Sequence, residues 1–210
     1  MSRPCRSLDG PSSDLAIQRI YSRLAQDEAR NRLILDDVIS AVEEGRSPIV
    51  LTERRDHLEY LSERLRSFVK HLIVLQGGMT TAERRVIGAR LAAVPDEEER
   101  LILATGKYAG EGFDDARLDT LFLAMPISWK GTLAQYAGRL HRFHPGKQEV
   151  RVFDYVDRDV PMLMRMFEKR LRTYRAIGYA RGEAPLGCSE PVEKWTVEYD
   201  EEALRRFDTT

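Results

Sequence analysis

Short apolar runs alternate with amphipathic stretches through most of this chain. Five runs have the length and apolar character of buried strands: PIVLT (48–52), HLIVLQ (71–76), RLILAT (100–105), LDTLFLAM (118–125) and EVRVFDYVD (149–157). Between them, apolar residues recur at helical spacing in 53–68, 77–94 and 129–143. Strands that alternate with helices predict an α/β fold, with a mostly parallel central sheet and helices on both of its faces.

The two ends of the chain have other patterns. Apolar residues at helical spacing from Asp14 to about Glu44 predict two helices that stop at Gly45. Residues 162–182 hold six basic residues and one acidic residue, and the chain is mainly acidic from Glu183 onward. A basic helix followed by an acidic tail is either a phosphate-binding surface that the tail covers or a solvated face beside a polar tail.

These patterns divide the chain into one main domain and its extensions. The expected parts are a disordered or linker segment (1–13), a helical lead-in (14–45), the α/β domain (46–160), a basic helix (161–182) and an acidic, poorly ordered tail (183–210). With 210 residues, of which 42% are hydrophobic and 32% charged, the chain can bury a core and is not a disordered protein.

Charge and cysteine content exclude some classes of protein. The net charge of −1 means that any footprint for a nucleic acid must be local. Cys5 and Cys188 lie in the expected tails without metal-ligand spacing, which indicates a reducing compartment and no disulfide framework. No stretch resembles a signal peptide or is apolar for long enough to span a bilayer. We therefore expect a cytoplasmic protein that does not bind membranes.

Several residues with known binding chemistry are better explained by packing. The histidines are scattered without metal-ligand spacing, namely His57, His71, His141 and His144. Trp129 and Tyr136 could stack on bases, but a core or domain-interface role is favoured. The methionines at 162, 164 and 166 suit packing better than a soft-metal site. We expect no metal site made by this chain.

Three glycines follow one of the strands in ILATGKYAGEGFDD (102–115). A buried strand normally ends in a short connection, whereas glycines let the backbone approach a ligand closely. In a parallel sheet, ligands bind beyond the carboxyl ends of the strands, where this stretch lies. The stretch is therefore a candidate binding loop.

A second candidate is QYAGRLHR (135–142). On a helix, Gln135, Gly138, Arg139 and Arg142 fall at i, i+3, i+4 and i+7, so they share one face. Two guanidinium groups on one face suit a polyphosphate, because arginine donates bidentate hydrogen bonds and keeps its charge. A glycine between them leaves room for a ligand or a neighbouring domain. Pairing of the two arginines with surface carboxylates is the simpler alternative.

Together these stretches resemble the second, C-terminal RecA-like domain of superfamily 2 helicases of the DEAD/DEAH type. QYAGRLHR matches the family motif Q-x-x-G-R-x-x-R at every specified position. The resemblance implies a RecA-like, three-layer α/β domain related to P-loop NTPases. It also implies that Arg142 is an arginine finger and that Arg139 is a second phosphate contact or a link between domains. Gln135 would lie near the nucleotide or its water, and Gly138 would be part of the nucleotide-binding face.

The glycine-rich stretch resembles motif V of the same family. There, a threonine and a glycine contact the nucleic-acid backbone, so Thr105 and Gly106 would offer a hydroxyl and a backbone N–H to a phosphate. A later glycine and aspartate face the nucleotide, which assigns that role to Gly112 and Asp114. Glu111 departs from the family, since many relatives carry arginine at this position.

Two further stretches resemble family motifs and are explained equally well by structure alone. IVLTERRDHLEYLSERL resembles motif IV, which makes Thr52 and Arg54 candidate phosphate contacts. LQGGMTTAERR resembles the glycine turn that follows it, which adds Gly77. Thr80 and Glu83 have the spacing of a capping box at the start of the next helix. Either stretch could be simply a parallel strand that enters an amphipathic helix.

The chain has no phosphate-binding loop of the form G-x-x-x-x-G-K-[ST] and no acidic pair for magnesium. The resemblance thus implies the second half of an ATP-dependent DNA helicase or translocase, nearest the restriction and repair branch and inactive alone. ATP and Mg²⁺ would be held mainly by an N-terminal RecA-like domain, and the track would be single- or double-stranded DNA, or RNA. The alternatives are a non-catalytic nucleic-acid-binding module and an interaction domain that forms a homodimer.

Overall fold

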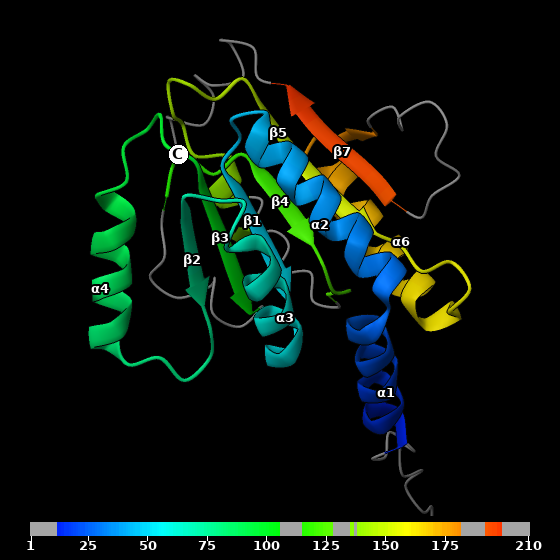
Figure 1. Ribbon diagram of the computed structural model, residues 1–210. Coiled ribbons are helices and arrows are strands. Elements are labelled where there is room, and N and C mark those ends of the chain that lie inside the picture. Colours follow the sequence, from blue (N-terminus) through cyan, green and yellow to red (C-terminus); the bar gives the residue numbers. More distant parts are fainter. Residues whose placement is uncertain (1–11, 106–114, 128–134, 137, 182–191, 199–210) are drawn as a thin grey trace, which may run out of the picture.

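The fold is built on a seven-stranded sheet of order β2-β3-β1-β4-β5-β7-β6 (Figure 1). The computed structural model describes residues 12–105, 115–127, 135–136, 138–181 and 192–198. Its strands are β1 (Pro48–Thr52), β2 (His71–Leu75), β3 (Arg100–Thr105), β4 (Thr120–Leu123), β5 (Glu149–Tyr155), β6 (Ala180–Arg181) and β7 (Val192–Glu198). The first five strands are parallel to one another, as the alternating pattern predicts.

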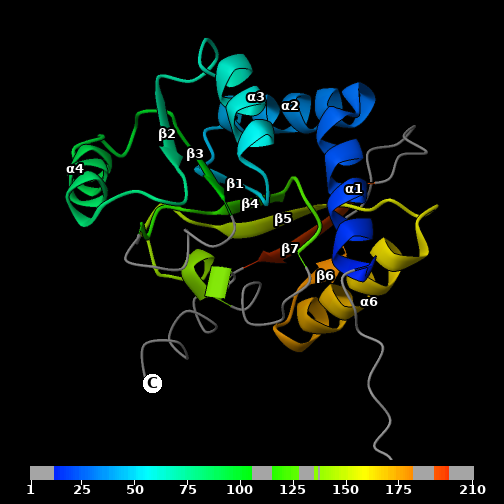
Figure 2. The same ribbon diagram turned by 90° about the horizontal axis from the view of Figure 1, so that it is seen from below.

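Helices cover both faces of this sheet because successive side chains of each strand point to opposite faces. On one face, α2 (Glu28–Glu43) and α3 (Arg55–Leu65) pack against Val50, Leu103 and Phe122. On the other face, α6 (Pro161–Ala176) and helical residues near Tyr136 and Leu140 pack against the alternate strand positions. Figure 2 shows α2 and α3 on one side of the sheet and α6 on the other. The predicted three-layer α/β arrangement is confirmed.

The first helix extends this core at one end of the molecule. α1 (Ser12–Gln26) buries Tyr21 and Leu24 against Met125, Leu163 and Met166 in a third apolar cluster. The Tyr21 hydroxyl also donates a hydrogen bond to the carbonyl oxygen of Pro126, at 2.6 Å. The packing role expected for the methionines therefore holds for Met166.

In contrast, α4 (Thr81–Ala92) is not part of the covering layers. It starts at the predicted capping box, in which the side chains of Thr80 and Glu83 each bond to the other's backbone N–H. Leu91 is its only buried residue. Figures 1 and 2 both place α4 beside β2, at the edge of the sheet.

Two expectations for the carboxyl-terminal part were wrong. The basic helix was expected to run to 182, but α6 ends at Ala176 and Gly178 adopts a φ of 87°, which favours glycine. The stretch 183–210 was expected to be a poorly ordered tail, yet its residues 192–198 form β7. This strand pairs antiparallel with β5 from Glu149↔Glu198 to Tyr155↔Val192. β7 thereby satisfies backbone groups of β5 that an edge strand would leave open.

One basic residue of α6 has a structural role. Arg170 is buried, and its Nε and Nη2 donate to the two carboxylate oxygens of Asp154 at 2.6 and 2.8 Å. The Tyr174 hydroxyl donates to the same carboxylate at 2.9 Å. This cluster joins α6 to the end of β5, so Arg170 does not belong to a phosphate-binding surface.

Candidate nucleotide and nucleic-acid site

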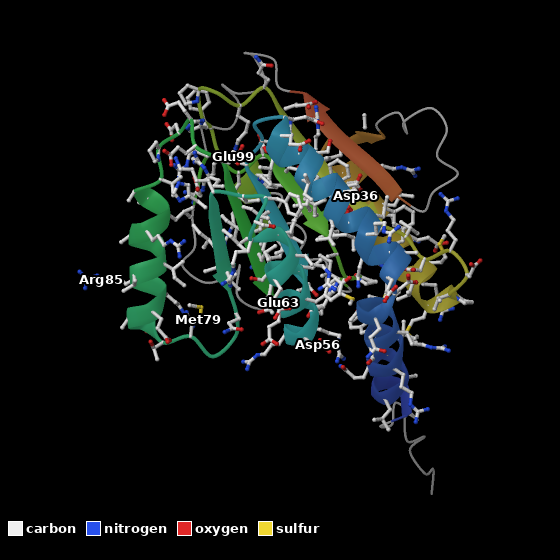
Figure 3. The ribbon with its side chains drawn as sticks, in the orientation of Figure 1. Asp36, Asp56, Glu63, Met79, Arg85 and Glu99 are labelled. Atoms are coloured by element: carbon white, nitrogen blue, oxygen red, sulfur yellow. The ribbon has the colours of Figure 1, made fainter. Side chains whose placement is uncertain are left out.

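The carboxyl ends of β1, β2 and β3 bring several of the predicted nucleic-acid contacts to one edge. Thr52 and Thr105 are Cα partners in the pairing of β1 with β3. Gly77 follows β2, and its backbone N–H donates to Oγ1 of Thr105 at 3.2 Å. Figure 3 places Asp56 and Met79 at this edge of the sheet and Glu99 at the opposite one. Residues from two predicted motifs, Gly77 and Thr105, are thus in direct contact.

Thr105 keeps the hydrogen of its hydroxyl group available among the described residues. Its side chain is buried apart from 8% of its surface, and the bond from Gly77 uses an oxygen lone pair rather than the hydroxyl hydrogen. Gly106, Gly112 and Asp114, which were expected to act with it, lie outside the described residues, as does Glu111. Their roles stay predictions.

Thr52 does not fit the expected phosphate contact in this chain. It is 1% exposed, and its Oγ1 lies 2.9 Å from Nδ1 of His57. Nε2 of His57 lies 2.9 Å from Oδ1 of Asn31, whose Nδ2 donates to the carbonyl of Ala25. Because Oδ1 of Asn31 can only accept, Nε2 of His57 carries the proton and Nδ1 accepts from the Thr52 hydroxyl. The hydroxyl hydrogen is therefore already used inside the protein.

Burial has a direct effect on His57. Desolvation, followed by the positive charge of Arg30, lowers the pKa of His57 from 6.5 to about 4. The imidazole is consequently neutral at pH 7, as the hydrogen-bond chain requires. No spacing in the sequence links Thr52, His57 and Asn31, so only the fold reveals this chain.

Arg54 and its neighbour Arg55 have different partners. Arg54 forms a bidentate pair with Asp56, with Nη2 to Oδ2 at 2.6 Å, and this hydrogen bond lowers the pKa of the Asp56 carboxyl. Arg55 instead donates from Nη2 to the carbonyl oxygen of Gly77. Sequence reasoning chose Arg54 and missed Arg55, because the start of α3 decides which of the two reaches the glycine turn.

The glycine turn after β2 has a backbone requirement of its own. Gly78 adopts a φ of 92°, and a Cβ built there would lie 3.3 Å from Nη2 of Arg55. A side chain at this position would be strained and would crowd Arg55. The turn, Arg55 and Thr105 thus form one connected unit, which we call the glycine-turn site.

The predicted arginine face lies on helical residues 135–136 and 138–140 and the turn that follows them. Tyr136 and Leu140 are buried in the core, whereas Gln135, Gly138 and Arg142 are exposed and Arg139 is half-buried. Burial lowers the pKa of Arg139. A Cβ built at Gly138 would have no atom within 4 Å, so open space adjoins it among the described residues.

The arginine face and the glycine-turn site are separate. Nε2 of His144, just after the helix, lies 3.7 Å from Oδ2 of Asp96, which precedes β3. The six residues of β3 separate that end of the sheet from Thr105, a distance of about 20 Å for a strand of this length. The end of the helix that carries Arg142 therefore lies toward the opposite end of β3 from Thr105.

Lys147 holds the end of the helix that carries Arg142. Its Nζ donates to the carbonyl oxygens of Leu140 and Arg142, each at 2.8 Å. Desolvation lowers the pKa of Lys147 from 10.5 to about 8, although Asp119 and Asp115 raise it. Sequence reasoning did not find this role, although a cation shortly after a helix is a known signal for such a cap.

Asp115, the last residue of the glycine-rich stretch, is fixed by Arg117. Nε of Arg117 donates to Oδ1 of Asp115 at 2.7 Å, and its Nη2 donates to the carbonyl of Leu91 at the end of α4. Arg117 also donates to the carbonyl of Val94 at 2.7 Å. The far end of the stretch is therefore anchored to the segment after α4.

Residues 15–144 match the protein family described as the helicase conserved C-terminal domain. The chain belongs to this family. It is a C-terminal helicase domain of superfamily 2 with a RecA-like fold, as the motifs indicated.

Viral proteins are among the relatives of this helicase domain. It is 28% identical over 141 residues to the transcript termination protein A18 of vaccinia virus (strain Ankara). This alignment covers 65% of this chain and 27% of the viral protein. The transcript termination protein OPG145 of monkeypox virus matches with the same identity and coverage. The chain thus spans only 27% of the length of these curated relatives.

Solved structures share the fold of this helicase domain. T4 UvsW superposes with a TM-score of 0.56 at 15% identity, covering 76% of this chain and 35% of UvsW. The C-terminal part of the Fun30 ATPase domain gives a TM-score of 0.52 at 14% identity, covering 61% of this chain and 40% of the other. At these identities the likeness concerns the fold.

Two other kinds of feature are absent from the described residues of the helicase domain. No group of three or more His, Cys, Asp or Glu side chains there could hold a metal ion. None of the described helices combines the length and the apolar character needed to cross a membrane.

Proposed function

We propose that this chain is the second motor domain of an ATP-dependent DNA helicase or translocase of superfamily 2. Membership in the helicase family supports the motor assignment. The observation that carries the nucleic-acid assignment is the hydrogen bond from Gly77 to Thr105, which joins two family motifs at the carboxyl edge of the sheet. The glutamine that begins QYAGRLHR favours the restriction and repair branch, which acts on DNA. The cysteine content favours a cytoplasmic location.

The glycine-turn site would contact the phosphates of one nucleic-acid strand. The Thr105 hydroxyl has a hydrogen that the bond from Gly77 leaves unused, and a hydroxyl is a suitable donor to a phosphate oxygen. Arg55 adds a positive charge to the same turn. Gly106 would add a backbone N–H. Arg54 is the weaker candidate, since Asp56 neutralises it.

The arginine face would meet the nucleotide held by the first motor domain. Arg142 is exposed and Arg139 half-buried on a helix whose opposite side is fixed by Tyr136 and Leu140. We assign Arg142 as the arginine finger, Arg139 as a second phosphate contact, and Gln135 and Gly138 as parts of the same face. A finger stabilises charge that develops on the transferred phosphoryl group, an effect of about 10³ to 10⁵ in rate.

This helicase domain would act only together with its first motor domain. It contains no phosphate-binding loop of the Walker type. ATP and Mg²⁺ would be bound mainly by the first domain, with Gly112 and Asp114 as expected contacts from this chain. Arg139 and Arg142 fit a role in completing the nucleotide site of the first domain, because arginines supply positive charge and not ligands for magnesium.

The test is ATP hydrolysis by the protein that contains both motor domains, with and without single-stranded DNA. Arg142→Ala should lower DNA-stimulated hydrolysis by about a hundredfold, which is roughly 2.7 kcal/mol of barrier. Arg165→Ala, which removes an exposed arginine of α6, is the matched control and should leave the rate within about twofold. Unchanged turnover in Arg142→Ala would remove the finger assignment.

A non-catalytic binding module is the second candidate, because the glycine-turn site needs no nucleotide. It predicts salt-dependent binding of single-stranded DNA with no hydrolysis by the two-domain protein. A concentration-dependent dimer without DNA binding would instead favour the interaction domain.

A further inference from the structure

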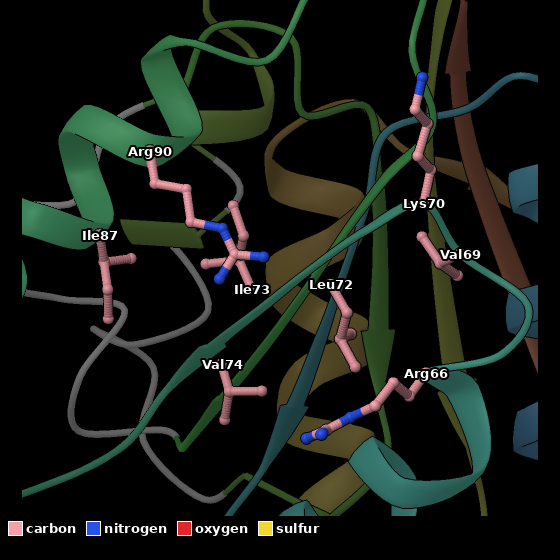
Figure 4. A pocket seen from close by; sticks show the side chains of 8 residues that line it. All are labelled: Arg66, Val69, Lys70, Leu72, Ile73, Val74, Ile87 and Arg90. Carbon is pink, nitrogen blue, oxygen red and sulfur yellow. The ribbon is translucent and has the colours of Figure 1, made fainter.

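A groove runs along the outer edge of the sheet, between β2 and α4. It has a volume of about 400 Å³ and is lined by residues of β2, of α4 and of the connection between α3 and β2, namely Arg66, Val69, Lys70, Leu72, Ile73, Val74, Ile87 and Arg90 (Figure 4). In the part of the chain that the structure describes, no strand pairs with the outer edge of β2. We call this feature the β2 groove.

The burial of β2 shows that this edge is incompletely covered. Every residue of β1 and β3 is buried, whereas His71, Leu72 and Val74 of β2 are only half-buried. α4 does not close the gap, since Leu91 is its only buried residue and Ile87 is half-buried against the core. An edge strand with open backbone groups and partly exposed apolar side chains can pair with a further strand.

The charges of the β2 groove restrict which strand this can be. Figure 4 shows Arg66 and Arg90 reaching toward β2 from the end of α3 and from α4. Lys70 points away from the groove and pairs with Glu98, with Nζ to Oε1 at 2.6 Å. Two guanidinium groups therefore face an apolar strand edge, and a segment with carboxylates would complement them.

We propose that the β2 groove binds an extended segment of a partner protein that carries both apolar and acidic residues. The segment pairs its backbone with the outer edge of β2 and thus adds a strand to the sheet. Because side chains alternate along a strand, one set meets Leu72, Val74 and Arg66 on the face that α3 covers. The other set meets Ile87 and Arg90 on the opposite face. This surface is independent of the arginine face and of the glycine-turn site.

Two other occupants are disfavoured by the same contacts. A second copy of this chain would bring the two arginines of one groove against those of the other, and like charges oppose such pairing. A nucleic acid would use the cations but would leave Leu72, Ile73 and Val74 without apolar partners. A phosphate backbone also offers no N–H groups to pair with a strand edge.

The experiment uses the whole chain and two labelled peptides, one of four Val-Glu repeats and one of four Val-Lys repeats. Fluorescence anisotropy should detect binding of the Val-Glu peptide and at least about tenfold weaker binding of the Val-Lys peptide. Amide hydrogen exchange should slow at residues 71–75 when the Val-Glu peptide is bound, because strand addition protects backbone N–H groups. No binding of the Val-Glu peptide, or no protection of β2, would overturn the proposal.

Two pairs of variants on α4 locate the binding surface. Arg90→Glu should weaken binding of the Val-Glu peptide by about fivefold to tenfold and strengthen binding of the Val-Lys peptide. Arg85→Glu makes the same charge change on a side chain that projects away from the sheet (Figure 3), and should change affinity less than twofold. Ile87→Asp and Val86→Asp form the second pair, since Ile87 lines the groove and Val86 is 68% exposed.

The remaining outcomes also decide the question. Equal losses in Arg90→Glu and Arg85→Glu would show general attraction between charges and would overturn the proposal. So would binding of a labelled dT oligonucleotide that Arg90→Glu abolishes while peptide binding is unaffected. Circular dichroism melts identify a variant that fails to fold. If Ile87→Asp fails in this way, the arginine pair, which changes only exposed side chains, still tests the proposal.

Discussion

Lys147 caps the segment that carries Arg142, since its Nζ donates to the carbonyl oxygens of Leu140 and of Arg142 itself, each at 2.8 Å. The proposed finger therefore depends on a residue five positions later in the chain. The finger must keep its backbone fixed to place a guanidinium with the precision that catalysis needs. Lys147 is thus a positioning residue for the proposed motor.

Lys147→Met should destabilise the domain by about 1 to 3 kcal/mol, because two carbonyl groups lose a charged donor. In the two-domain protein it should also lower the rate of ATP hydrolysis, whereas Lys147→Arg should retain part of both properties. Chemical unfolding and steady-state kinetics measure the two effects. Lys169→Met, on the exposed side of α6, is the control, and a loss of equal size there would argue against the cap.

The pH dependence of stability should carry a signature of Lys147. Its pKa is about 8 in the folded protein and 10.5 when unperturbed. Between these two values the unfolded chain binds more protons, so stability should rise with pH across about 8 to 10.5. Lys147→Met lacks this group and should not show that rise. Parallel pH profiles of wild type and variant, measured by urea unfolding, would contradict the buried environment of the amine.

Thr105 and Thr52 lie side by side across β1 and β3 but should respond differently to the same substitution. Thr105→Val removes a hydroxyl of the glycine-turn site and should weaken binding of single-stranded DNA by about fivefold. Thr52→Val leaves Nδ1 of His57 without its donor and should cost about 1 to 3 kcal/mol of stability. The folded Thr52→Val variant should bind single-stranded DNA with nearly the affinity of the wild type. Anisotropy titrations measure DNA binding and thermal melts measure stability. Equal effects of the two substitutions on DNA binding would indicate that Thr52 also contacts the nucleic acid.

The strand and helix order could be predicted because each element had a local cause. β1, β3 and β4 are continuous apolar runs that end up buried on both faces, and α4 starts at a capping box that four residues define. β7 could not be predicted in this way. It exists because β5 offers an edge, which lies more than thirty residues earlier in the chain.

Only the parts of the candidate site that match family motifs could be predicted from the sequence. The glycine-rich stretch and the glycine turn were expected from resemblance, and the contact between Gly77 and Thr105 joins them. Motifs did not indicate that Asn31 and His57 would consume the hydroxyl of Thr52, because those partners come from two different helices. Nor did they distinguish Arg55 from Arg54, since that choice depends on the phase of one helix.

Acid should unfold the domain partly through His57. The pKa of His57 is lowered from 6.5 to about 4, so the unfolded chain takes up a proton in this range before the folded one does. The contribution of His57 to stability is complete above pH 6.5 and is lost as the pH falls toward 4. His141 has a lowered pKa of about 4 for the same reason, burial, and contributes in the same window. His57→Asn should therefore flatten the profile only in part, and the double variant with His141→Asn should flatten it further in urea titrations between pH 7 and pH 4.

The pair of Asp154 and Arg170 should be the most sensitive ion pair among the residues that the structure describes. Both side chains are at most 5% exposed, so Asp154→Asn leaves a buried guanidinium without its counter-charge, at a cost of about 3 to 5 kcal/mol. Asp96→Asn is the matched change at an exposed carboxylate, since Asp96 is 61% exposed beside Arg117, and it should cost less than about 1 kcal/mol. Denaturant unfolding measures both. A small effect of Asp154→Asn would mean that α6 is held to β5 by its apolar contacts, with Phe167 and Tyr174 in the core, rather than by this carboxylate.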